Sequence, residues 1–156
     1  MHICVLGSWR ESVGETNRTI AEVLREMGHV VTPLPSVSGM ALKFSHPVLA
    51  GLAQKRLERV LFQYDAVVVN GSTLDYVRVA QAMHNRPTII WAQGDCAFEN
   101  ASLKLSNVTF ICCCEGQMQQ ANQSGFEAVA IEPFKGKPPR EEIRQRLENL
   151  LTEEAA

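Results

Sequence analysis

The chain has 156 residues, of which 46% are hydrophobic and 21% are charged, and its formal net charge is −2. This length and composition fit one globular domain with a full core. The nearly balanced charge provides no basic surface for nucleic acid, so no nucleic-acid partner is expected. No apolar run approaches the roughly 20 residues that span a bilayer, and the N-terminus lacks a signal-peptide pattern. We therefore expect a cytoplasmic protein without a membrane span.

The first predicted elements are a strand, a helix and a second strand. Residues 3–6 form a short apolar run that reads as a buried strand. The apolar residues of 17–27 follow the i, i+3, i+4, i+7 spacing of an amphipathic helix, and Gly28 stands where a left-handed cap belongs. Residues 29–34 then form the second strand.

The remaining elements continue this alternation. Further strands are predicted at residues 66–69, 88–91, 108–113 and 128–131. Further helices are predicted at residues 47–62, 74–84, 97–105, 115–124 and 140–151.

This order of elements predicts the fold class. Six strands alternating with helices imply a doubly wound, mostly parallel sheet with helices on both faces, a Rossmann-like three-layer α/β/α sandwich. We expect a single domain over residues 1–156, in which a linker and a closing helix (137–156) follow a core (1–136). Ligands of such sheets bind beyond the carboxyl ends of the strands, where the strand order reverses.

Five cysteines stand at positions 4, 96 and 112–114, without any C-x-x-C spacing. A disulfide framework and a zinc site are therefore not indicated. In a buried strand, consecutive members of the 112–114 run would face opposite helix layers and pack as small hydrophobes. Only Cys114, beside a helix N-terminus, is a candidate for a lowered thiol pKa.

The loop after the first strand contains two candidate ligand-binding residues. The segment is neither a G-x-G-x-x-G turn nor a Walker A loop, so no cofactor is predicted. Gly14, just before the predicted helix, would leave backbone N–H groups free to bind an anion, and Arg10 would assist. A flexible loop in which the glycine only eases the turn is the alternative.

Polar residues follow the third and fourth predicted strands. Asn70 and Ser72 can hydrogen-bond a polar ligand, although they are equally common turn and helix-capping residues. Gln93 and Asp95 follow the fourth strand, and Asp95 is the candidate catalytic residue, as a general base. No histidine lies near Asp95 in sequence to complete a triad.

A series of short motifs lies at the starts and ends of the predicted strands. These motifs are Gly28-His29 before an apolar strand, Tyr64-Asp65 before another, and the segments 87–94, 110–115 and 131–136. In this order, from Met1 to about Gly136, they resemble the N-terminal, acceptor-side domain of GT-B glycosyltransferases, especially the retaining family-4 type. Two departures are Gln93, where the family has His, and Cys114, where it has Ser.

The resemblance implies roles for the candidate residues. Gly14 would approach the phosphates of the sugar donor. Glu115 would orient the loop after the fifth strand. The acceptor side would be lined by Asn70, Ser72, Gln93 and Asp95.

The resemblance also implies what the chain lacks. The C-terminal donor domain of the family is absent, and transfer needs both partners held together. We therefore expect a glycosyltransferase-like domain that binds a sugar acceptor or a nucleotide sugar and is inactive alone. Its expected partner is a donor-domain subunit or a second copy of the chain, and whether it is an enzyme stays open.

Two other classes remain as alternatives. One is a receiver-like, flavodoxin-like protein-interaction module, suggested by Gly125-Phe126 and Pro133-Phe134 before a closing helix. It would be non-phosphorylated, because receivers need an acidic pair after the first strand and an aspartate where this chain has Asn70. The other is a small nucleoside-processing enzyme, for which Asp75 offers the required carboxylate.

Overall fold

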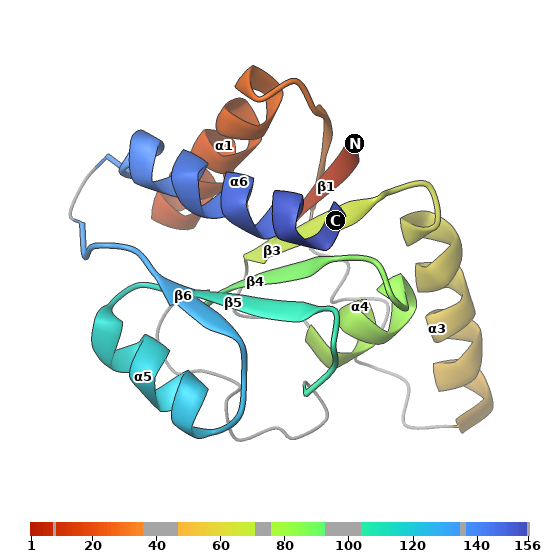
Figure 1. The fold of residues 1–156 in the computed structure, drawn as a ribbon. Helices are drawn as coiled ribbons and strands as arrows, with labels where there is room; N and C mark the ends of the chain where they lie inside the picture. Colours follow the sequence, from red (N-terminus) through yellow and green to blue (C-terminus); the bar gives the residue numbers. More distant parts are fainter. Residues whose placement is uncertain (8, 36–46, 71–75, 93–103, 135–136, 156) are drawn as a thin grey trace.

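The protein folds around one sheet of six parallel strands, described by a computed structural model for residues 1–7, 9–35, 47–70, 76–92, 104–134 and 137–155 (Figure 1). The strands lie in the order β2-β1-β3-β4-β5-β6, and all neighbours are parallel. The strands are β1 (His2–Gly7), β2 (Val30–Pro35), β3 (Ala66–Asn70), β4 (Thr88–Ala92), β5 (Val108–Cys112) and β6 (Ala128–Ala130). The helices in the described residues are α1 (Glu11–Glu26), α3 (Pro47–Leu61), α4 (Tyr76–Met83), α5 (Glu115–Gln123) and α6 (Arg140–Ala155).

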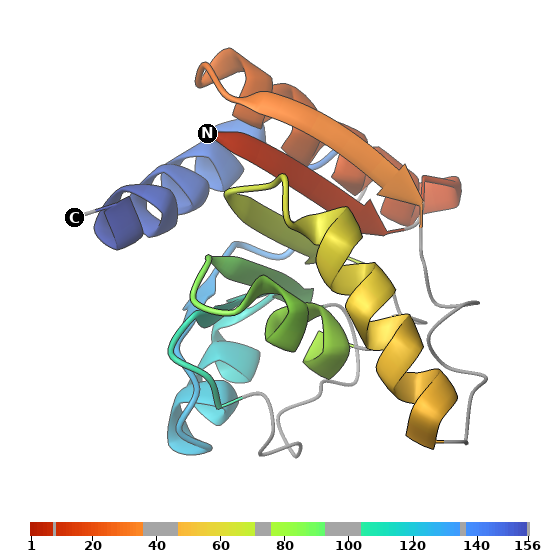
Figure 2. The same ribbon diagram turned by 90° about the vertical axis from the view of Figure 1, so that its right-hand side faces the viewer.

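Helices cover both faces of this sheet. Apolar side chains of α1 and α6 pack on one face, against residues such as Ile3, Val68 and Ile111. Helices α3, α4 and α5 pack on the other face. The two views show these layers on opposite sides of the strands (Figures 1 and 2). The predicted three-layer α/β/α fold is confirmed.

The predicted elements agree with the structure except at a few boundaries. All six predicted strands are present, and the complete burial of β3, β4 and β5 explains why the sequence shows them as unbroken apolar runs. Helix α1 begins at Glu11, six residues before the predicted start at Asn17. Most of the predicted helix at 97–105 lies outside the described residues.

The strand order specifies the type of doubly wound sheet. In the order 2-1-3-4-5, strand β1 has β2 on one side and β3 on the other, and the chain direction across the sheet reverses there. This order is the flavodoxin-like one, whereas the dinucleotide-binding type has the order 3-2-1-4-5-6. The protein therefore has a flavodoxin-like arrangement with a sixth strand at the β5 edge.

The edge strand β2 is protected against pairing with another strand. The N–H of Val30 donates to the carbonyl of Met1, so alternate residues of β2 turn their backbone groups outward. Two of these outward positions are Pro33 and Pro35, which have no N–H. Arg25 also donates to the outward carbonyl of Val31. This edge is thus poorly suited to strand addition.

Arg86 ties the ends of α3 and α4 together. Its guanidinium donates to the carbonyls of Leu61 and Tyr64 at 2.7 Å, around the C-terminus of α3. It also donates to Met83 at 3.0 Å and to Ala82 at 3.1 Å, at the C-terminus of α4. A single cation therefore satisfies carbonyls that helices leave unpaired and interacts favourably with two helix dipoles.

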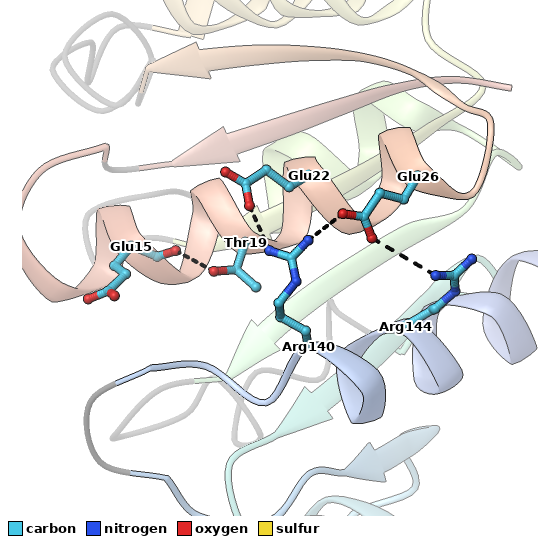
Figure 3. Close-up of polar contacts among 6 residues, drawn as sticks. All are labelled: Glu15, Thr19, Glu22, Glu26, Arg140 and Arg144. Carbon is cyan, nitrogen blue, oxygen red and sulfur yellow. Dashed lines mark hydrogen bonds and ion pairs between the residues drawn. The ribbon is translucent and has the colours of Figure 1, made fainter.

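Helix α6 packs across α1, and exposed ion pairs line the contact (Figure 3). The guanidinium of Arg140 contacts the carboxylates of Glu22 and Glu26, and Arg144 lies 3.9 Å from Glu26. These side chains are roughly half exposed, so apolar packing of Ile143, Leu147 and Leu151 holds α6 in place more than the charges do.

In the described part of the chain, no helix is long and apolar enough to cross a bilayer.

Candidate functional site

The candidate site lies at the carboxyl ends of β1 and β3. The two strands are neighbours, yet α1, which follows β1, covers one face of the sheet, and α4, which follows β3, covers the other. The helices that follow β1 and β3 therefore lie on opposite faces of the sheet. In open α/β sheets, such switch points are where ligands bind.

Three residues from different elements meet at this edge. The side-chain amide of Asn17, on α1, donates to the backbone carbonyl of Asn70 at 3.2 Å. Gly7 is paired with Asn70 across the two strands. A Cβ atom on Gly7 would lie 1.9 Å from the carbonyl oxygen of Asn70, so only glycine permits this approach. The edge is therefore closely packed and positions Asn70 firmly.

The N-terminus of α1 adds backbone donors to the same edge. Gly14 is the fourth residue of the helix, and its N–H donates to the carbonyl of Arg10 at 3.0 Å. The first three residues, 11–13, precede this bond, so their N–H groups have no acceptor within the helix. The side chain of Arg10 makes no capping hydrogen bond. A positive helix end thus faces the region after β1.

Gly14 itself has a packing role. A Cβ atom on Gly14 would lie 2.3 Å from the backbone of Trp9, which crosses the first turn of the helix. The indole of Trp9 in turn donates to the carbonyl of Leu34 at 2.9 Å and fixes this crossing. The expected contact between Gly14 and a phosphate is not tested by this arrangement and stays a prediction.

Two buried donors belong to residues at the carboxyl ends of the neighbouring strands β3 and β4. Nδ2 of Asn70 and Nε1 of Trp91 are both buried without a hydrogen-bond partner in the described structure. Asn70 is 1% exposed and Trp91 is 0% exposed. The register pairs Val69 with Ile90, so one further residue brings Asn70 beside Trp91. Both follow the alternation of Val68 and Ile89 toward the face covered by α1 and α6.

The other predicted site residues are distributed as follows. Arg10 is exposed at the start of α1 and Asn70 is central to the edge. Glu115 is exposed in the first turn of α5, on the β5–β6 side of the sheet. There it lines an open groove of about 460 Å³ with Glu132, Glu142 and Arg146, and so does not join Asn70. Ser72, Gln93, Asp95 and Asp75 lie outside the described residues.

The cysteine run has the predicted alternation. Cys112 is buried among the residues that pack against α4 and α5, whereas Cys113 packs toward the α1 face. The thiol of Cys113 donates to the carbonyl of Ala92 at 3.1 Å. Cys4 is buried in the core, and this burial raises the pKa of its thiol to about 12, so the thiolate that a nucleophile needs is disfavoured near neutral pH. Over the described ranges, no group of three His, Cys, Asp or Glu side chains is placed to hold a metal ion.

Comparisons with known proteins add the following. No model of a known protein family matches the chain, and no curated protein sequence matches it. A flavodoxin mutant from Pseudomonas aeruginosa matches in structure at 16% identity, with 99% of this chain and 97% of the other covered and a TM-score of 0.42. An NAD(P)H:quinone oxidoreductase from Methanothermobacter marburgensis matches at 14% identity, with 100% and 94% covered and a TM-score of 0.45.

These findings correct the resemblance to GT-B glycosyltransferases. The matching solved structures are flavodoxins and a quinone oxidoreductase, not glycosyltransferase domains. The prediction failed because its motifs mark strand starts and helix ends, which all doubly wound sheets share. The expected sugar ligand and donor-domain subunit depended on that resemblance and are not carried further. Self-association stays an untested prediction. At these identities and TM-scores, function has to be argued from the site.

Proposed function

We propose that this protein is a non-phosphorylated binding module of flavodoxin-like fold, which holds a small ligand at the carboxyl edge of β1, β3 and β4. The observation that carries the proposal is Asn70. It is 1% exposed, it stands at the switch point, and its Nδ2 has no hydrogen-bond partner in the described structure. An unsatisfied buried donor costs roughly 1–3 kcal/mol of stability, and a hydrogen bond to an acceptor atom of a ligand would remove this cost.

The arrangement argues against chemistry of the receiver type. A phosphorylated receiver carries an aspartate at the end of the third strand, and this chain has a buried amide there. An amide cannot accept a phosphoryl group in the way that a carboxylate does. Gly7 ends β1, where receivers have acidic residues. Binding, without transfer of a group to the protein, is the function that these residues support.

The test maps binding by NMR. The amide resonances of Gly7, Gly14 and Asn70 report on the edge, and those of Gly28 and Gly125 report on the amino ends of the strands. Titration uses FMN, NADP⁺, ADP and inorganic phosphate. We expect at least one of these ligands to shift the amide resonances of the edge saturably, while the resonances of Gly28 and Gly125 do not change. Failure of the whole panel to shift the edge, or shifts confined to the amino ends, would overturn it.

A second candidate function is protein interaction through α3. Val48, Leu52 and Phe62 are 63%, 59% and 81% exposed, which is unusual for large apolar side chains. Val48 and Leu52 lie on one face of the helix with the exposed cations Lys55 and Arg59, and Phe62 follows the end of the helix. The apolar side chains and the cations together complement a partner segment that has an apolar stripe flanked by carboxylates.

The α3 candidate is tested with a synthetic helical peptide. The peptide presents leucines on one face, flanked by glutamates, and its control carries lysines instead. We expect binding of the glutamate peptide alone, weakened by salt and by Leu52→Glu. Equal binding of both peptides, or of neither, would contradict an acidic partner at α3.

A further inference from the structure

Asn70 and Trp91 each carry a buried donor without a hydrogen-bond partner in the described structure. Asn107 is also buried, at 5% exposure, but its Nδ2 donates to the carbonyl of Arg86 at 3.0 Å. The indole of Trp9 donates to Leu34. The donors of Asn70 and Trp91, in contrast, have no hydrogen-bond partner in the described structure. Two such donors beside each other are not explained by packing.

The strand register places the two residues next to each other. Neighbouring strands lie about 4.8 Å apart, and residues in register on one face direct their side chains the same way. Asn70 ends β3 and Trp91 is the penultimate residue of β4, so both lie at the edge where ligands of this fold bind. A carbonyl oxygen has two lone pairs and can accept one hydrogen bond from each donor.

The apolar packing around Trp91 favours a neutral acceptor at its indole over an anion. Trp91 lies in an apolar cluster with Val5, Val68 and Ile111, and the partly buried Trp9 and Cys113 pack against this cluster. An anion buried against two neutral donors alone would lose most of its hydration energy without compensation. An uncharged carbonyl loses far less and gains both hydrogen bonds.

We propose that Asn70 Nδ2 and Trp91 Nε1 form a recognition site for the neutral carbonyl group of a heterocycle or carboxamide. The inference rests on the proposed function, because it names the chemistry of a ligand at the same edge. The two donors select for a carbonyl oxygen and against a group that itself donates at that position. A ligand with an amino group there would meet two donors and be rejected.

The test uses the two tryptophans of the chain as matched probes. The indole N–H resonance of Trp9, which is hydrogen-bonded to Leu34, is the internal control for that of Trp91. Uracil, nicotinamide and riboflavin are the carbonyl probes, and acetate and inorganic phosphate are the anionic ones. We expect a carbonyl probe to move the Trp91 indole proton downfield and saturably, with Trp9 unchanged. Asn70→Leu should weaken that binding at least tenfold.

The outcomes separate this inference from the proposed function. If ligands shift the amides of Gly7 and Asn70 but leave the Trp91 indole unchanged, the edge binds ligands and the carbonyl site is wrong. If the anions move the Trp91 indole and the carbonyl probes do not, the neutral selectivity is wrong. If the Trp91 indole proton already has the chemical shift of a hydrogen-bonded group and no probe moves it, bound water is its partner. That result would overturn the inference. A Trp91→Phe variant would also change the packing of the core, so Asn70→Leu is the variant that tests the site.

Discussion

The side-chain amide of Asn17 donates to the backbone carbonyl of Asn70 across 3.2 Å, and this contact joins α1 to the end of β3. Both residues are buried. The bond fixes the main chain of Asn70 through a residue of the helix that begins at the same edge. It leaves the side-chain amide of Asn70 available to an acceptor. The carboxyl edge is thus held rigidly in the protein while one of its donors has no protein partner.

Gly7→Ala should disrupt this edge. The added methyl group would lie 1.9 Å from the carbonyl oxygen of Asn70, so strand β1 or β3 must move. We expect a loss of about 2–3 kcal/mol in the free energy of unfolding, as for overpacked cores, together with loss of ligand response. Gly51→Ala is the control, because no atom lies within 4 Å of its added Cβ on α3. It should stabilise by about 0.5–1 kcal/mol. Urea denaturation measures both, and equal effects would contradict the close approach.

Removal of the Arg86 guanidinium should destabilise α3 and α4 together. Arg86→Ala removes the guanidinium hydrogen bonds to carbonyls at the ends of both helices. We expect a loss of about 3 kcal/mol, since hydrogen bonds to charged groups contribute more than neutral ones. Arg86→Lys should recover less than half, because an ammonium cannot span both helix ends. Arg56→Gln, at an exposed position of α3, should change stability by less than about 0.5 kcal/mol. Full recovery by lysine would show that charge alone matters.

Alkaline pH should destabilise the protein through Cys4. Burial raises the pKa of this thiol from its ordinary 9.0 to about 12. The unfolded chain therefore loses the proton first, so the stabilising contribution is complete below pH 9.0 and is lost as the pH rises toward about 12. Cys4→Ala should be less stable near neutrality but show a flatter decline above pH 9.0. Urea denaturation at stepped pH measures the two slopes. Parallel slopes would contradict the assignment to Cys4.

The sequence predicted much of the fold because the sheet is buried on both faces. Strands such as 66–70 and 88–92 are apolar throughout, which separates them from the amphipathic helices around them. The start of α1 was missed because Gly14 is a poor helix former. Glycine stands at position 14 because the backbone of Trp9 packs against it. This contact leaves no pattern in the sequence that would predict it.

The candidate site was predictable only in part. Asn70 could be identified because a polar residue at the end of a buried strand is conspicuous. Trp91 could not be identified, since it stands inside an apolar strand and looks like a core residue. Its role depends on whether the indole N–H has an acceptor, which only the packed structure shows. The strand order could not be predicted from the sequence either, because it depends on which strands pair across the sheet.

The most direct test of the site is the stability of Asn70→Leu compared with Asn107→Leu, measured by urea denaturation without ligand. Both asparagines are buried, but the side-chain amide of Asn107 donates to Arg86 and that of Asn70 has no partner in the described structure. We predict that Asn107→Leu loses about 1–3 kcal/mol, whereas Asn70→Leu is as stable as the natural protein or more so. A loss at Asn70 equal to that at Asn107 would show that its amide serves the fold, and would contradict the proposed site.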